Sequence, residues 1–195
     1  MKIIKIIFIV LISFNSYSQK KIKINFKIEN DSTIIQYLKN KKIKFSNNQI
    51  ATLKGIGTFA EYGRTERLVI PEAFFFNSKG ELIKNKGKGV YCGAELKELK
   101  KVSKMKSDSS KTLDNFLEKD IKILDSSSII DENVDLYIFI TWGKFLSTES
   151  EISLNWFSNL TEQENLKIKV FLLNLDIQEN WNLTLGQKEY LEITE

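Results

Sequence analysis

Cys92 is the side chain of this chain whose type best suits covalent chemistry. A reactive cysteine needs an accessible, electropositive setting that favours the thiolate. Lys86 and Lys88 precede it, and a helix expected from Ala94 would add the positive end of its dipole. The sequence therefore allows an enzyme that uses Cys92 as a lone thiol, for example a one-cysteine peroxidase. The alternative is a small buried thiol with no reactivity.

A second candidate site is the corner Trp142–Leu146, where a strand is expected to end and a helix to begin. In a sheet covered by helices, ligands bind at the carboxyl ends of strands and the amino ends of helices. Free N–H groups at the helix start, together with the charge of Lys144, could hold an anion or an extended peptide. The alternative is a tight turn in which Trp142 packs as core.

Two further groups of residues are weaker candidates. The loop 84–89 is rich in lysine and glycine and could hold a phosphate in its backbone N–H groups. It lacks the G-x-x-x-x-G-K-[ST] spacing of a nucleotide loop. Six carboxylates could form acid–base pairs for glycoside hydrolysis, although nothing in their spacing fixes a separation. They are Glu61, Glu66, Glu72, Asp131, Glu132 and Asp135. We expect ordinary surface charge at both groups.

Scarce residue types restrict the remaining chemistry. The 195 residues include no histidine and one cysteine, and only Arg64 and Arg67 among the 29 basic residues are arginines. A Ser-His-Asp or Cys-His mechanism and a His-ligated metal are therefore excluded, as is an internal disulfide. We expect no metal and no cofactor. The preference for lysine over arginine also argues against a nucleic-acid partner.

The pattern of the elements that must position these residues predicts an α/β fold, with a mixed sheet and helices on both of its faces. The strongest strand, Val134–Trp142, is apolar on both faces, which is typical of a sheet covered on both sides. A helix starting near Ser147 and a strand at Lys167–Leu175 would complete a right-handed strand-helix-strand unit.

The rest of the chain gives shorter patterns. Strands are expected around the single proline, with a tight turn at 77–80, and amphipathic helices further on. The stretch 47–63 cannot be assigned. The expected strands are 21–29, 42–45, 67–70, 73–76 and 81–85, and the expected helices are 94–102 and 113–124, separated by a polar break at 107–110.

Two segments together resemble the thioredoxin fold. The strand ending in Trp142, with the helix and strand that follow to Asp176, resembles its first half; Ile70–Ile83 looks like its second half, with a cis-proline at Pro71. The resemblance implies a thioredoxin-like core that is permuted or elaborated, because the halves occur in reverse order. Gly143 and Leu146 stand where the family has its redox cysteines, so thiol–disulfide exchange is not implied.

The first eighteen residues predict export. A basic start, an apolar run and a small-residue cleavage site before Gln19 are typical of a secretory signal. We expect a periplasmic or extracellular protein without a transmembrane anchor after cleavage. Residues 19–195 would form a single domain, with a β-rich elaboration at 19–63 and a thioredoxin-like core at 64–195. Cleavage removes two lysines and lowers the net charge from +4 to +2.

The function expected from these patterns is a noncatalytic binding or scaffolding module of the cell envelope with a protein or peptide partner. The residues expected to bind are Trp142, Lys144, Phe145 and the loop before Pro71.

Overall fold

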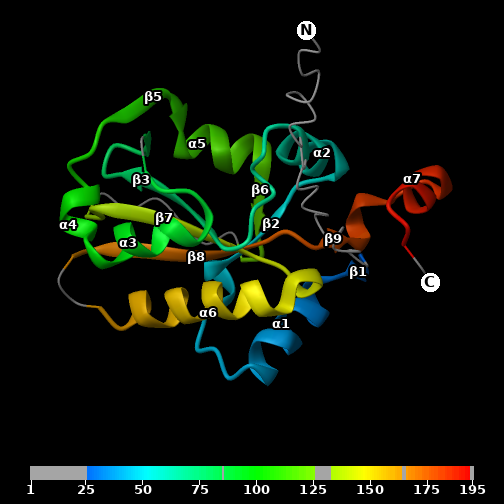
Figure 1. Cartoon of the computed structure of the whole chain (residues 1–195). Coiled ribbons are helices and arrows are strands. Elements are labelled where there is room, and N and C mark those ends of the chain that lie inside the picture. Colours follow the sequence, from blue (N-terminus) through cyan, green and yellow to red (C-terminus); the bar gives the residue numbers. More distant parts are fainter. Residues whose placement is uncertain (1–25, 85, 126–132, 164–165, 194–195) are drawn as a thin grey trace, which may run out of the picture.

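A mixed seven-stranded sheet forms the centre of the protein (Figure 1). The computed structural model describes residues 26–84, 86–125, 133–163 and 166–193. The strand order is β5-β4-β3-β7-β8-β2-β6, and β1 (Ile28–Glu29) pairs in parallel with β9 (Ile177–Gln178) in a separate small sheet. Helices cover both faces of the large sheet, so the predicted α/β class is confirmed.

The strand β7 (Leu136–Trp142) lies in the middle of the sheet and is buried along its whole length. It pairs in parallel with β8 (Ile168–Asn174) and antiparallel with β3 (Glu72–Asn77). The helix α6 (Ser147–Thr161) connects β7 to β8. The predicted strand-helix-strand unit is therefore confirmed, with boundaries that differ by one or two residues.

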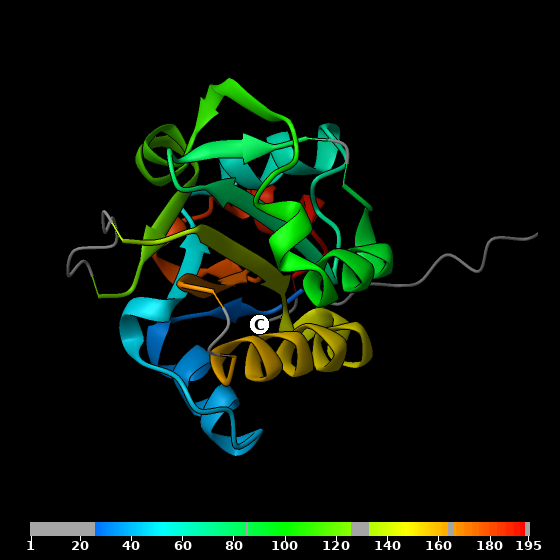
Figure 2. The same cartoon turned by 90° about the vertical axis from the view of Figure 1, so that its left-hand side faces the viewer.

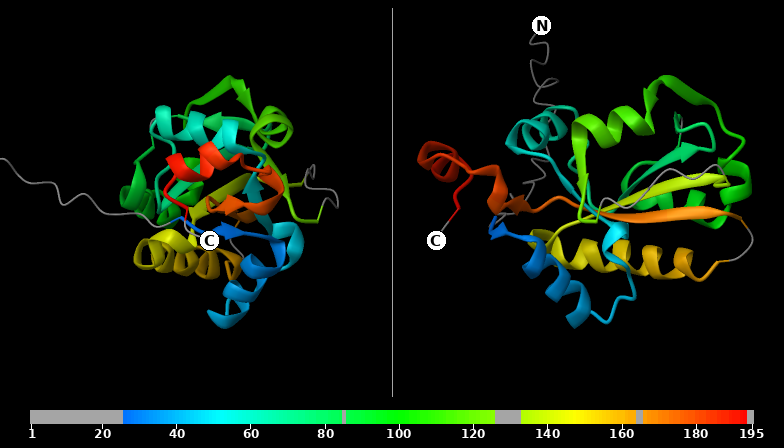
Figure 3. Two further views of the ribbon diagram at one scale, coloured as in Figure 1. Left: turned by 90° about the vertical axis from the view of Figure 1, so that its right-hand side faces the viewer. Right: turned by 180° about the vertical axis from the view of Figure 1, so that it is seen from behind.

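Successive residues of β7 point into two separate hydrophobic cores, as the alternation of a strand requires. Ile138 and Ile140 belong to one core, and Tyr137 and Phe139 to the other. Seen from behind, the two layers of helices lie on opposite sides of the sheet (Figure 3). The first layer contains α6 with α1 (Asp31–Asn40), α3 (Cys92–Lys97) and α4 (Leu99–Val102), and the second contains α2 (Ile56–Arg64) and α5 (Leu113–Asn115).

The hairpin after Pro71 has the predicted turn. β3 and β4 (Glu81–Ile83) are joined through Gly80, whose φ of 74° suits glycine and whose N–H donates to the carbonyl of Asn77 across 2.8 Å. The side chain of Asn77 accepts from the N–H groups of Lys79 and Glu81. Residues 67–70, expected to be extended before the proline, are not a strand.

The stretch 47–63, which the sequence left unassigned, contains two regular elements. β2 (Ile50–Leu53) lies between β8 and β6, and α2 follows it. All four residues of β2 are buried, so the strand shows no polar alternation. The segment 19–63, predicted as a β-rich elaboration, thus contributes β2 to the central sheet.

Several other predictions for local structure are wrong. Residues 42–45 form no strand, and the polar break at 107–110 is part of the edge strand β5 (Ser107–Thr112). The helix expected at 94–102 is divided at Glu98 into α3 and α4. The helix expected at 113–124 consists of α5 and the π-helical turn η3 (Phe116–Asp120), and its last residues form β6 (Ile121–Ile123) instead. Pairing of β6 with β2 outweighs the helical spacing there.

The predicted signal segment lies outside the described residues, as does most of the strand expected at 21–29, of which Ile28–Glu29 is β1. None of the helices in the described ranges is long and apolar enough to cross a membrane. Near the C-terminus, α7 (Leu185–Tyr190) projects away from the sheet (Figure 1). Short 3₁₀ turns occupy η1 (Asn47–Gln49), η2 (Gly89–Tyr91), η4 (Lys144–Leu146) and η5 (Glu179–Trp181).

Candidate functional site

The corner at the end of β7 lies directly beside the start of β3. Thr141 is paired with Glu72 in the antiparallel register, and its hydroxyl donates to the carbonyl of Val69 across 2.6 Å. The Ile70–Pro71 peptide bond is cis, as the resemblance implied. Trp142 and Pro71 are therefore brought together from segments about seventy residues apart, which the sequence alone could suggest only through that resemblance.

This corner is filled by the protein's own side chains. The indole of Trp142 is fully buried and stacks on Tyr37 of α1, with ring centroids 5.6 Å apart. Phe145 packs against Phe26, with centroids 5.0 Å apart, and Pro71 is buried as well. Trp142 and Pro71 thus belong to the core that supports the corner, and they present no surface to a partner in this arrangement.

Three N–H groups of the turn that precedes α6 are already bonded. Asp176 accepts from the N–H of Lys144 across 2.9 Å and from that of Phe145 across 3.4 Å. The hydroxyl of Ser150 accepts from the N–H of Gly143 across 2.9 Å. These three donors are therefore not free, because the carboxylate of Asp176 and the hydroxyl of Ser150 already accept from them.

The charge of Lys144 is also used internally. Its ammonium group pairs with the carboxylate of Glu29, a buried side chain on β1. Burial raises the pKa of the nearby Asp176, and the negative charge of Glu29 adds to this effect, although hydrogen bonds from Lys144 and Asn174 oppose it. The corner consequently works as an internal polar joint between β1, the end of β8 and the start of α6.

Cys92 lies in a second buried polar cluster. Its thiol is fully buried and donates to the carboxylate of Glu72 across 2.8 Å. Burial and this hydrogen bond raise the pKa of the Cys92 thiol to about 12, and the ammonium of Lys86 only partly opposes them. The thiolate is thus disfavoured, and the setting is that of an unreactive buried cysteine.

Glu72 is the central acceptor of this cluster. It accepts from the thiol of Cys92, from the N–H groups of Ala73 and Gly89, and from the ammonium of Lys86. Burial by itself would raise the pKa of Glu72, but the bonds from Cys92 and Lys86 outweigh it and lower that pKa overall. An ionised Glu72 therefore joins β3 to the loop that leads to α3.

The lysine- and glycine-rich loop offers no open phosphate cradle. The N–H of Gly87 donates to Glu95 across 2.8 Å, and the N–H of Gly89 donates to Glu72 across 3.0 Å. Lys86 points inward to Glu72, and Lys84 pairs with Asp108. Two of the basic side chains and both of these backbone donors are thus used within the protein.

The four candidate carboxylates that the structure describes do not form acid–base pairs. Glu72 is held in its own cluster, Glu61 and Glu66 are exposed, and the carboxylate of Asp135 accepts from the N–H of Lys167 across 3.0 Å. Asp131 and Glu132 lie outside the described residues.

An open groove that was not predicted from the sequence lies between α3–α4 and α6. Its volume is about 1010 Å³, and its lining is mostly apolar. Figure 2 looks toward this end of the molecule, with α3 and α4 beside α6. The groove is lined by Val90, Tyr91, Gly93, Leu96, Val102, Met105, Ile152, Trp156 and Leu160, with Glu95, Lys97, Glu98 and Lys101 among the polar lining residues.

Three large apolar side chains of the groove face solvent. Val90 is 55% exposed, Tyr91 76% and Ile152 38%. The indole of Trp156 also lines the groove and packs against Gly93, where an added Cβ would come within 3.3 Å of the ring. The sequence signal that could have found this surface is the apolar pair Val90–Tyr91 inside a loop otherwise made of lysine and glycine.

A smaller apolar pocket of about 430 Å³ lies between α2 and α7. Phe59 and Leu68 line it from one side, and Tyr190 and Leu191 from the other. Tyr190 is 87% exposed, so this end of the chain also presents an aromatic side chain to solvent.

Comparison of this chain with protein-family models, with curated proteins and with solved structures gave no match.

Proposed function

We propose that this protein is an exported, noncatalytic binding module, built on a rearranged thioredoxin-like core, that holds a protein or peptide partner in the groove between α3–α4 and α6. The observation that carries the proposal is the groove itself, because it combines concave shape with solvent-exposed apolar side chains on a folded scaffold. Exposed apolar surface of this kind is typical of interaction sites.

The thioredoxin-like core is supported by the arrangement of the two segments that carry the resemblance. The hairpin β3–β4 and the β7–α6–β8 unit share one sheet, and β3 is the direct neighbour of β7. Pro71 immediately precedes β3, while Gly143 immediately follows β7. This is the placement expected if the two halves form one core in reverse chain order.

A binding role fits the chemistry of the two buried clusters better than catalysis does. Gly143 and Leu146 provide no thiol at the positions where the resemblance places cysteines. The remaining thiol, Cys92, is buried and its pKa is raised to about 12. Both polar clusters instead hold segments of the chain together, which stabilises a scaffold.

The binding site is tested by photo-crosslinking from two tyrosines that share high exposure. A photoreactive phenylalanine analogue replaces Tyr91 in one protein and Tyr190 in the other, and each is irradiated with the source organism's envelope and extracellular fractions. We expect a discrete adduct from position 91 that excess unlabelled protein suppresses. An adduct from position 190 alone would move the site to α7, and no suppressible adduct from either would contradict the proposal.

Export is tested separately. We expect to find the protein in the envelope or the medium, with a mature N-terminus at Gln19. Mass spectrometry of the isolated protein identifies that N-terminus directly. Recovery of the full-length chain from the cytoplasm would contradict export and leave the groove unaffected.

A further inference from the structure

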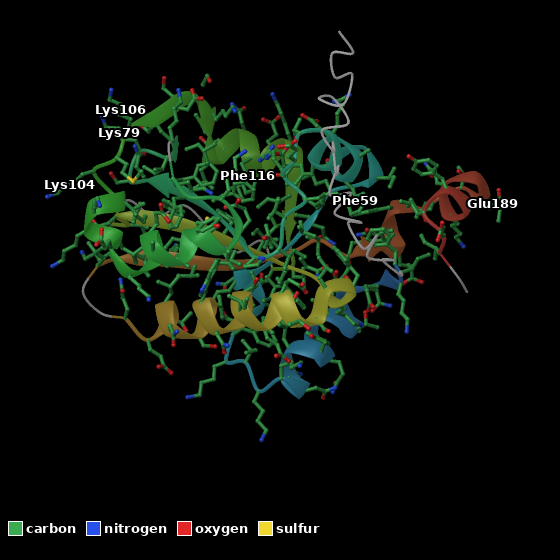
Figure 4. The ribbon with its side chains drawn as sticks, viewed as in Figure 1. Phe59, Lys79, Lys104, Lys106, Phe116 and Glu189 are labelled. Carbon is green, nitrogen blue, oxygen red and sulfur yellow. The ribbon has the colours of Figure 1, made fainter. Side chains whose placement is uncertain are left out.

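The groove continues into a surface dominated by positive charge. Lysines recur along α3, α4 and the segment that follows, and all of them are exposed. Figure 4 shows Lys79, Lys104 and Lys106 at the same end of the molecule, opposite Glu189 on α7. The lysines of this surface are Lys97, Lys100, Lys101, Lys104 and Lys106, and we call them the lysine rim.

Among the described residues, most lysines of the rim have no acidic partner. Lys101 pairs with Glu98 across 3.1 Å, but in the part of the chain that the structure describes no ion pair joins the other four to a carboxylate. The nearby Asp108 is already paired with Lys84 across 3.3 Å. Because the mature chain is almost neutral as a whole, this surplus of positive charge is local.

The apolar groove and the lysine rim are continuous. Lys97 and Lys101 line the groove together with Val102 and Met105, and Lys104 follows α4 at its end. A segment lying in the groove would therefore place apolar groups against Tyr91 and carry its next residues past the rim.

We propose that the groove takes an acidic peptide segment whose aliphatic or aromatic anchors are followed by a run of carboxylates. This inference rests on the proposed function and names the chemistry of its partner. Charge complementarity favours an acidic occupant, since the unpaired lysines beside the apolar groove attract negative charge and orient the segment. Met105 lines the groove, and a flexible methionine adapts to side-chain anchors of different shape.

The test uses defined peptides and the purified full-length protein. One fluorescent peptide carries leucine and phenylalanine anchors followed by glutamates; matched peptides carry glutamine or lysine in place of each glutamate. We expect the glutamate peptide to bind at least about tenfold more tightly than the glutamine peptide, and the lysine peptide not to bind. A higher salt concentration should weaken the binding of the glutamate peptide, because it screens the attraction between exposed charges.

Charge-reversal variants locate the contact. Lys100→Glu combined with Lys104→Glu should lower the affinity for the glutamate peptide about tenfold. The matched control reverses two exposed lysines elsewhere, Lys39→Glu on α1 with Lys119→Glu on η3, and should leave the affinity within about twofold. Equal losses in both variants would overturn the inference, because they would show general attraction to a basic protein.

The remaining outcomes separate this inference from the function on which it rests. Equal binding of the glutamate and glutamine peptides, lost in both cases on Tyr91→Ser, would overturn the acidic preference and keep the groove as a binding site. Binding of vesicles containing anionic lipid, without binding of the glutamate peptide, would replace the peptide by a membrane surface and overturn the inference. If no peptide binds and position 91 gives no crosslink, both the inference and the proposed function fail.

Discussion

The carboxylate of Asp176 lies 2.9 Å from the backbone nitrogen of Lys144 at both of its oxygens. Asp176 follows β8 and Lys144 follows β7, so this contact joins the ends of two parallel central strands. An anion bound at the N–H of Lys144 would have to displace a side chain of the protein itself. The corner at Gly143 is therefore a structural joint, and the open groove lies elsewhere on the molecule.

Asp176 should make the protein less stable as the pH rises. Burial raises its pKa above the usual 3.8. In the pH range between the usual and the raised pKa, the folded state therefore binds more protons than the unfolded state. The free energy of unfolding of the wild type, relative to that of Asp176→Asn, should therefore fall as the pH increases through this range. Urea titrations at several pH values measure it, and a difference that rises with pH contradicts the assignment.

Glu72 should show the opposite pH dependence. Its pKa is lowered below the usual 4.5 by bonds from Cys92 and Lys86, so its contribution is present at neutral pH and lost as the pH falls through the lowered value. Glu72→Gln should cost about 3 kcal/mol at neutral pH, since it leaves the ammonium of Lys86 buried without its partner. The cost should shrink in acid; a cost independent of pH would show that Glu72 is not ionised.

The Cys92 thiol should be inert in the folded protein. Burial raises its pKa to about 12, so very little thiolate exists at about pH 8. A thiol reagent should modify the denatured chain quickly and the native chain only at the rate of unfolding. Rapid modification of the native protein would contradict the buried placement and revive a thiol enzyme.

Trp142→Ala should lower the free energy of unfolding of the whole protein and not only weaken binding. The indole is fully buried against Tyr37, and truncation of a buried aromatic side chain costs about 3–5 kcal/mol. Tyr190→Ala, which removes an exposed ring, should change the free energy of unfolding by no more than about 0.5 kcal/mol. Chemical denaturation measures both, and equal costs would place Trp142 at the surface.

Two glycines should respond in opposite ways to alanine. At Gly143 an added Cβ would lie 2.7 Å from the ring of Phe145 and 3.2 Å from Ile70, so Gly143→Ala should destabilise by about 1–3 kcal/mol. Gly57 lies within α2 with no atom within 4 Å of that position, so Gly57→Ala should stabilise by about 0.5–1 kcal/mol. Thermal unfolding of both variants checks the pair, and a stable Gly143→Ala variant would show that Phe145 moves freely.

The long central elements could be predicted because local pattern and tertiary setting agree there. β7 and β8 are apolar on both faces, and α6 has a clear helical spacing between them. The hairpin turn was readable for a similar reason, since Asn77 and Gly80 satisfy it through local bonds.

The missed elements depend on distant partners. β5 consists of serines, charges and a threonine, and it is a strand because it pairs with β4. β6 continues a helical pattern but pairs with β2. The two candidate site residues Trp142 and Lys144 were placed at the correct corner, but the sequence could not show that Tyr37, Glu29 and Asp176 from remote segments would close it.

The polar composition of β5 has a consequence for how the molecule behaves among its neighbours. β5 ends the sheet on one side, and the register between β4 and β5 shifts at Glu81–Leu82. A rim strand rich in hydroxyls and charges, with an irregular ladder, is a poor template for the backbone of another copy. The stretch 107–110, which the sequence showed only as a polar break, therefore disfavours edge-to-edge pairing of two copies on this side of the sheet.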